Sequence, residues 1–248
     1  MATQLSPFVH ILDDLVPQQR VAEAYMIFRE LPILPGLFYV SLDQMTDEGA
    51  VSLLADYLPR SAADFLITHL QLLIEHSPAE ALNGADGFEF WVGNKVRTEN
   101  SAFLHVDNDE YLRHGTGEVR CPIMGSIFHF GPARDLRGGE TLFDLSPSDC
   151  GGSERQRRLF TWEPWDSVMV HAVAPILVPQ RSGRLILFRG DLPHAVAPIH
   201  ECPAHEPRVT LLANLWKRRI SSVTSGVAAL SPQEFAAQLK GQGPDSGP

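Results

Sequence analysis

The nine residues from Arg208 to Trp216 place the strongest constraint on the fold. Every odd-numbered position in this segment is apolar, whereas the even-numbered positions carry Arg208, Thr210, Asn214 and Trp216, with Leu212 among them. Alternation with a period of two predicts a β-strand whose faces have different surroundings. We therefore expect one face to pack against an apolar layer and the other to line a polar cavity.

Six further segments between residues 88 and 188 are short and rich in aromatic or branched residues. Turns that contain glycine or proline separate them. The segments are 88–92, 103–106, 123–130, 141–143, 168–178 and 184–188. Many short strands at this spacing predict an all-β sandwich or barrel rather than alternating β-α-β units.

Residues 1–80 predict helices that supply the apolar layer. Pro17 can open a helix that runs to Phe28, and a second helix is expected over 46–58. Ser61 is placed as the N-cap of a third, whose apolar residues between 66 and 74 form a wide stripe. Amphipathic helices of this kind must lie against a large apolar surface.

The chain has the size and composition of one globular domain. It has 248 residues, of which 44% are hydrophobic and 20% charged. We expect a single domain over 1–248, with helical support at 1–80, a β core that carries the site at 87–217, and a tail at 221–248. In the tail, the Ser231–Glu234 capping box predicts a short helix, and the end beyond Gly241 is expected to be disordered.

Charge and cysteine usage narrow the class of protein. The formal net charge of −10 argues against a nucleic-acid partner, and therefore also against an enzyme that demethylates nucleic acids. Cys121, Cys150 and Cys202 form no disulfide framework, which fits a reducing cytoplasm. The N-terminus lacks the pattern of a signal peptide, and no segment is apolar over the roughly 20 residues that span a bilayer. We expect a cytoplasmic protein without a membrane partner. The sequence does not indicate its oligomeric state.

A candidate metal site begins with His105-Val106-Asp107. On a strand, residues two apart point to the same side, so an imidazole and a carboxylate would enter one space. A second histidine from a distant strand would complete a set of two histidines and one carboxylate that leaves open positions on iron(II). Two histidines compete for this role, because the hexapeptide His-Ala-Val-Ala-Pro-Ile begins at both His171 and His194.

Four motifs follow one another in an order that identifies a family resemblance. They are His-x-Asp at 105–107, Gly-Arg-Leu-x-x-Phe at 183–188, His-x-Val-x-Pro at 194–198 and Arg-x-Thr at 208–210. This order resembles the 2-oxoglutarate- and iron(II)-dependent oxygenase superfamily. It is most similar to the prolyl-hydroxylase-like branch, where Asn108 and Gly138-Gly139-Glu140 also have counterparts. The resemblance spans about residues 88–217 and implies a mostly β fold: a double-stranded β-helix core (jelly-roll or cupin-like) with supporting N-terminal helices.

The resemblance also implies the ligands and the reaction. It favours His194 over His171, because the residues after His171 match the strand that precedes the ligand strand. The catalytic and metal-binding set is then His105, Asp107 and His194, and the cofactors are Fe(II) and 2-oxoglutarate, with ascorbate as a candidate reductant. The reaction would use O₂ and release succinate and CO₂ while hydroxylating an unactivated C–H bond. Asp107 favours hydroxylation, since halogenases of the superfamily lack this carboxylate.

Arg208 is the expected partner of 2-oxoglutarate. Its guanidinium can hold the distal carboxylate with two hydrogen bonds, and the Thr210 hydroxyl on the same face can add another. His129 stands where the hypoxia-sensing prolyl hydroxylases, by resemblance, place a tyrosine that touches this carboxylate.

The substrate is the part that the sequence identifies least. Candidate substrate residues lie near the ligands or share a face with them, and their cations and amides suit a small polar metabolite with a carboxylate, such as an amino acid or a natural-product intermediate. They are Trp91, Arg97, Asn100, Asn108, Arg113, Arg137, Asn214 and Trp216. The long connection at 144–164 is a candidate lid.

Three alternatives stay open beside this hypothesis. A peptidyl-prolyl or protein hydroxylase is favoured by the Asn108 and Gly138-Gly139 likeness. A non-catalytic jelly-roll binding protein would retain the fold without the reaction. A zinc site at His200, Cys202 and His205 is disfavoured, because no further ligand pair has finger-like spacing.

Overall fold

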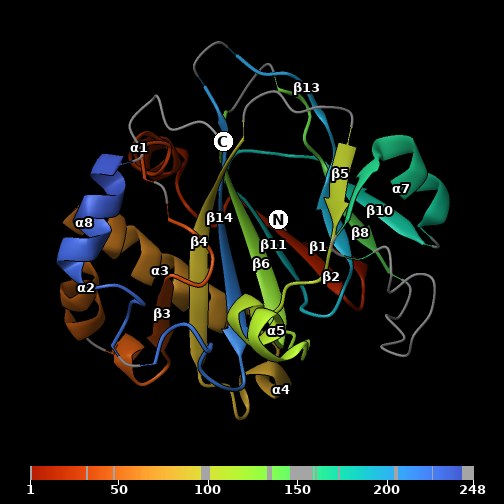
Figure 1. Ribbon diagram of the computed structural model, residues 1–248. Coiled ribbons are helices and arrows are strands. Elements are labelled where there is room, and N and C mark those ends of the chain that lie inside the picture. The colour runs from red at the N-terminus through yellow and green to blue at the C-terminus, as the bar shows by residue number, and fades with distance from the viewer. Residues whose placement is uncertain are drawn as a thin grey trace.

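The computed structural model covers the 248-residue chain (Figure 1). It describes residues 2–31, 33–46, 48–95, 101–132, 136–145, 159, 161–172, 174–203, 206–224 and 226–241. The predicted disordered end and most of the candidate lid at 144–164 lie outside these residues.

A seven-stranded antiparallel sheet forms the centre of the molecule (Figure 1). Across the sheet the order is β1 (Ala2–Ser6), β2 (Val9–Asp13), β11 (Arg184–Arg189), β6 (Met124–Gly131), β14 (Arg208–Trp216), β4 (Gly87–Lys95) and β3 (Phe38–Ser41). Strand β14 pairs along its whole length with β4 and is also paired with β6 on its other side. The two-faced segment is therefore a central strand, with the surroundings of both faces set by its neighbours.

Smaller antiparallel sheets lie on one side of the large sheet (Figure 1). One consists of β10 (Pro175–Val178), β8 (Thr141–Asp144) and β12 (His194–Val196); the others pair β13 (Ile199–Glu201) with β7 (Arg137–Gly138) and β5 (Ser101–Leu104) with β9 (Thr161–Pro164). Phe143 and Val178 of the three-stranded sheet pack with Ile127 and Ile186 of the large one. The face of the large sheet that carries these residues, here called the inner face, is thus covered by a second β layer. The fold is mostly β, while its description as a double-stranded β-helix remains a prediction.

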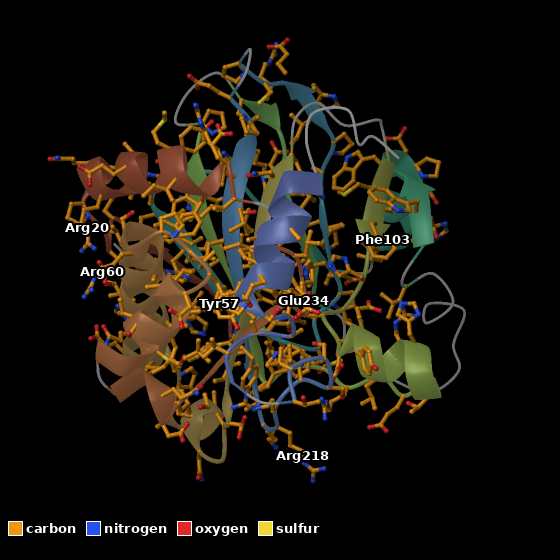
Figure 2. All side chains as sticks on the ribbon, turned by 60° about the vertical axis from the view of Figure 1, so that its left-hand side comes forward. Arg20, Tyr57, Arg60, Phe103, Arg218 and Glu234 are labelled. Carbon is orange, nitrogen blue, oxygen red and sulfur yellow. The ribbon has the colours of Figure 1, made fainter. Side chains whose placement is uncertain are left out.

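Helices cover the opposite, outer face (Figure 1). They are α1 (Gln18–Phe28), α2 (Glu48–Ala55), α3 (Arg60–His76) and α8 (Pro232–Gly241). Their apolar residues form one core with the odd-numbered residues of β14, which confirms the predicted apolar face of that strand. In Figure 2, Arg20 and Arg60 extend from α1 and α3 away from this core. Short helical elements complete the described chain: η1 (Gln44–Thr46), α4 (Ala79–Leu82), α5 (Glu110–Thr116) and α7 (Trp165–His171).

Residues 1–80 supply helices, as expected, and also three strands that the sequence analysis did not predict. This region also supplies β1, β2 and β3 to the large sheet. Strand β2 pairs with β11, which lies far along the chain, so that Asp13 is the partner of Arg184. A strand of five residues has little periodicity of its own, and its pairing partner cannot be read from the local sequence.

Two local expectations also need correction. The sequence predicts a strand over 168–178, but α7 occupies 165–171 and only Pro175–Val178 is extended. Pro164 stands at the N-cap of α7 with Asp166 in its first turn, which are features of a helix start. Helix α3 begins at Arg60 after Pro59, so Ser61 lies inside the first turn and is not its N-cap.

The C-terminal helix begins as predicted. Ser231 and Glu234 form the capping box: the Ser231 amide donates to Glu234 Oε2 at 2.8 Å, and the Glu234 amide donates to Ser231 Oγ at 3.3 Å. Within the described residues, no helix has both the length and the apolar character needed to cross a membrane.

Candidate metal centre

The structure brings His105, Asp107 and His194 together. His105 follows β5, and His194 begins β12. Their backbones form a bridge: the His105 amide donates to the His194 carbonyl at 3.0 Å, and the His194 amide donates to the His105 carbonyl at 2.8 Å. Asp107 Oδ1 lies 3.7 Å from Nε2 of each histidine. These three side chains are the metal-competent group found in the described part of the chain.

Backbone carbonyls fix the orientation of both imidazoles. Nδ1 of His105 lies 3.0 Å from the Phe103 carbonyl, and Nδ1 of His194 lies 3.0 Å from the Leu192 carbonyl. A carbonyl only accepts, so each Nδ1 carries the proton and each Nε2 presents its lone pair toward Asp107. Burial lowers the pKa of His105, and the neighbouring His194 adds to this effect. The His105 ring is therefore neutral at neutral pH, as a metal ligand must be.

The donor set fits iron(II). Two imidazole nitrogens and one carboxylate oxygen, all from buried or half-buried residues, form the two-histidine, one-carboxylate set that non-haem iron uses. His171, the rival from the repeated hexapeptide, is exposed on α7 and lies outside this group. Of the alternative zinc residues, His200 is exposed and His205 lies outside the described residues.

Arg208 lies on the inner face with its charge buried. The residue is 2% exposed, and its Nε and Nη2 have no hydrogen-bond partner in the described structure. Burial lowers its pKa to about 10. A buried arginine that lacked a partner would be costly, so two unpartnered nitrogens indicate a site for an anion.

The other residues predicted beside Arg208 lie on the same face. Thr210 is the register partner of His129 on β6 and of Gly93 on β4. Both ring nitrogens of His129 are buried without partners among the described residues, and burial together with Arg208 holds the pKa of His129 well below its usual range. A neutral His129 offers one N–H donor for the same anion.

Lys95 is a candidate anion ligand that the sequence reasoning missed. It is the register partner of Arg208 and is half-buried. Burial, and then the charge of Arg208, lower the pKa of Lys95 to about 8. Two cations held side by side repel each other unless an anion lies between them. Residues 89, 91, 93 and 95 share one face of β4, but that this face adjoins the inner face of β14 follows only from the strand pairing.

A cavity of about 490 Å³ opens beside the metal ligands. Trp91, Asn108 and Asn214, three of the residues predicted to contact the substrate, line it. Trp216 shares the inner face but is buried, and its Nε1 donates to Glu89 Oε2 at 3.1 Å.

Two of the predicted cationic substrate residues, Arg113 and Arg137, do not line this cavity. Arg113 pairs with Glu110 at 2.7 Å and does not line the cavity. Arg137 is exposed and pairs with Glu201 at 3.1 Å. Arg97 and Asn100 lie outside the described residues. Arg113 lies on α5 and Arg137 on β7, so neither belongs to the inner face of β4 and β14.

No family model and no curated protein matches the sequence. Among solved structures, a prolyl-4-hydroxylase from Pseudomonas putida is 14% identical, covering 85% of each chain with a TM-score of 0.48. A Trichoplax adhaerens prolyl hydroxylase, in complex with a peptide of the hypoxia inducible factor oxygen degradation domain, is 11% identical, covering 89% of this chain and 88% of that one with a TM-score of 0.47. An oxidoreductase of the 2OG-Fe(II) oxygenase family from Burkholderia pseudomallei is 10% identical, covering 85% and 67% with a TM-score of 0.35.

These neighbours come from the superfamily that the sequence motifs resemble. All three TM-scores lie below 0.5, so the function proposed below is inferred from the residues of the site itself.

Proposed function

We propose that this protein is an iron(II)- and 2-oxoglutarate-dependent oxygenase that hydroxylates an unactivated C–H bond of a small polar molecule. The observation that carries this proposal is the convergence of two Nε2 atoms, each 3.7 Å from Asp107 Oδ1, with both imidazoles oriented by backbone carbonyls. His105, Asp107 and His194 would hold the iron. When bound, iron with 2-oxoglutarate and O₂ supplies the oxidising power for C–H hydroxylation, with succinate and CO₂ as co-products.

The buried cations support 2-oxoglutarate as the co-substrate. Arg208 is the proposed partner of its distal carboxylate, with Thr210, His129 and Lys95 around it. The charge of Glu140 offsets part of that of Arg208, and an anionic co-substrate would compensate the two cations further, which a neutral or cationic one would not.

The size of the cavity supports a small substrate. About 490 Å³ lies within the range typical of small-molecule sites. The β layer and the core beneath β14 exclude water from the anion site, which strengthens the hydrogen bonds made by Arg208.

The double-stranded β-helix, with residues 87–217 as the catalytic core, is the arrangement we propose for these sheets.

Succinate formation tests the reaction. The purified protein, supplied with Fe(II), 2-oxoglutarate and ascorbate in air, should produce succinate, including the slow turnover that occurs without substrate. Asp107→Ala should abolish this production, because one of three ligands is lost. Asp56→Ala removes a carboxylate from an exposed position just after α2 and should leave it unchanged. Equal succinate production by both variants would contradict the proposal, and 2-oxoglutarate binding without succinate would favour a non-catalytic binding protein.

A further inference from the structure

The cavity beside the metal ligands contains a carboxylate that the proposed iron and 2-oxoglutarate sites do not use. Glu89 lies on the inner face of β4, directly opposite Asn214 of β14 in register. It is 6% exposed and lines the same cavity as His105 and Asp107. Its location therefore places an acid in the space where a substrate would lie.

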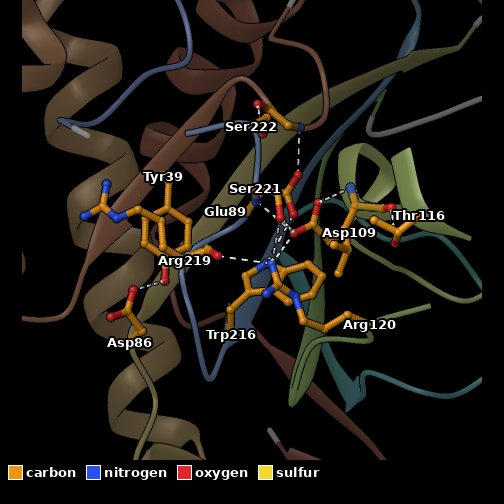
Figure 3. Close-up of polar contacts among 12 residues, drawn as sticks. Tyr39, Asp86, Glu89, Asp109, Thr116, Arg120, Trp216, Arg219, Ser221 and Ser222 are labelled. Carbon is orange, nitrogen blue, oxygen red and sulfur yellow. Dashed lines mark hydrogen bonds and ion pairs between the residues drawn. The ribbon is translucent and has the colours of Figure 1, made fainter. Parts of the chain in front are cut away.

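Glu89 is held in position by hydrogen-bond donors. The Gly36 amide donates to Oε1 at 2.7 Å, and Trp216 Nε1 donates to Oε2 at 3.1 Å (Figure 3). Each oxygen keeps a lone pair beyond these bonds. No lysine, arginine or histidine pairs with Glu89 in the described part of the chain, so this carboxyl group has no cationic partner there.

The neighbouring acids are already compensated. Asp109 accepts from Arg120, from the Ser221 amide and hydroxyl at 2.8 Å, and from the Leu112 amide at 3.1 Å (Figure 3). Glu110 pairs with Arg113 at 2.7 Å. Asp107 is assigned to the metal. Among the described residues, Glu89 is thus the cavity acid that has neither a cationic partner nor an assigned role.

Two buried amides add acceptors that lack donors among the described residues. Asn108 Oδ1 and Asn214 Oδ1 are buried without partners, and both residues line the cavity. The Asn108 orientation is fixed, because its Nδ2 donates to Glu110 Oε1 at 3.0 Å and lies 3.4 Å from the Val106 carbonyl, both acceptors. A ligand that satisfies this cavity must therefore bring donors.

We propose that Glu89 is a specificity-determining residue that binds a cationic group of the substrate, an ammonium or a guanidinium. The proposal rests on the oxygenase function above and names its substrate class: a small molecule with an amine or guanidine at one end. Asn214 would accept a hydrogen bond from the same group. Trp91, two residues from Glu89 on the same face, offers an aromatic ring to the cation. A substrate recognised by its carboxylate, the expectation from the sequence, would meet Glu89 and find neither Arg113 nor Arg137 in the cavity.

Calorimetric binding to the zinc-loaded protein with 2-oxoglutarate tests this inference without turnover. The probes are agmatine, which has two cationic ends, and two amino acids of nearly equal shape: arginine, and citrulline, which has a neutral ureido group in place of the guanidinium and keeps the α-ammonium. We expect agmatine and arginine to bind and citrulline to bind at least about tenfold more weakly. Glu89→Gln should weaken arginine binding about 10- to 100-fold and remove most of the preference over citrulline.

The controls separate charge from folding. Glu75→Gln makes the same change at an exposed position on α3 and should bind like the unmodified protein. Because the glutamine amide introduced by Glu89→Gln would face two N–H donors, Asn214→Ser provides a second variant, expected to weaken arginine binding more than citrulline binding. Melting temperatures and far-UV spectra report whether each variant folds.

The outcomes distinguish this inference from the proposed function. Agmatine and arginine binding that stay unchanged in a folded Glu89→Gln protein would overturn the cationic-substrate inference while succinate formation still supported the oxygenase. Charge-dependent binding that requires Glu89, in a protein that forms no succinate, would support the cation site and refute the oxygenase.

Discussion

Replacing Arg208 with methionine should change stability and co-substrate binding in opposite directions. Arg208 is buried with two nitrogens that lack partners among the described residues. Each unsatisfied buried donor costs about 1–3 kcal/mol, so the variant without ligands should be as stable as the parent or more stable by up to a few kcal/mol. For a chain of this size, that corresponds to a melting temperature between unchanged and roughly 10 °C higher.

Binding of 2-oxoglutarate should weaken severely in the same variant. Hydrogen bonds to charged groups contribute about 1.5–3 kcal/mol each, so two of them account for about 3–6 kcal/mol. At about 1.4 kcal/mol per tenfold, the dissociation constant should rise roughly 10²- to 10⁴-fold. Calorimetry with the zinc-loaded protein measures this constant, and thermal unfolding without ligands measures stability.

Arg184→Met is the matched control. Arg184 pairs through Nε and Nη2 with both oxygens of Asp13, at 2.8 and 2.9 Å, so it has the structural role that Arg208 lacks. The control should lower the melting temperature and leave 2-oxoglutarate binding near the parent value. If Arg208→Met were instead the destabilised variant and still bound 2-oxoglutarate normally, Arg208 would be a structural residue and the reasoning would fail.

Three further predictions concern buried or strained groups. His69 is 1% exposed with both ring nitrogens unpartnered among the described residues, and burial lowers its pKa to about 3. The unfolded chain binds a proton at this histidine near its ordinary pKa of 6.5, so the stability present above pH 6.5 is lost as pH falls toward 3. His69→Leu should therefore make the free energy of unfolding in urea less dependent on pH between about 7 and 5. An unchanged pH dependence would contradict this. Burial, and then the charge of Asp107 and Asp109, raise the pKa of Glu89 to about 8 against its two hydrogen bonds. Agmatine should therefore bind the metal-free protein more tightly as pH rises to about 8, and a flat profile between about pH 6 and 8 would show that Glu89 does not lose a proton on binding. Gly138→Ala should lower both the melting temperature and the affinity for 2-oxoglutarate, because φ of Gly138 is 85° and an added Cβ would lie 2.0 Å from the Pro198 carbonyl oxygen. Gly84→Ala is the control: φ of Gly84 is 76°, and open space surrounds it, so this variant has the backbone strain without the collision. Equal effects of the two substitutions would refute the steric reasoning.

The site residues on one strand are the easiest to predict from the sequence. Alternation along β14 determines which side chains share the inner face, so Arg208, Thr210 and Asn214 follow from period two alone. The spacing of His105 and Asp107 has the same basis. Lys95 and Glu89 obey the same alternation on β4, but their importance depends on which strand lies beside β14. That pairing is non-local and has no signature in the segment itself.

Other expectations are harder to judge from the sequence, because proximity along the chain does not give position at the site. Arg113 follows Asp107 by six residues but pairs with Glu110, and the exposed Arg137 pairs with Glu201. Strands β1 and β2 fall in a region for which the sequence analysis predicts helical support, and five-residue strands carry too little periodicity to be recognised. His194 is separated from His171 by its family context, and the structure supplies the physical difference: one histidine begins a strand that is bridged to His105, and the other ends an exposed helix.

Anaerobic addition of Fe(II) and 2-oxoglutarate tests the central claim most directly. The bidentate complex at a two-histidine, one-carboxylate site should give a weak visible charge-transfer band. His194→Ala should abolish the band, whereas His171→Ala, the same substitution in the same hexapeptide, should leave it intact. No band in the unmodified protein, or a band that survives His194→Ala and disappears with His171→Ala, would contradict the assignment of His105, Asp107 and His194 as the iron site.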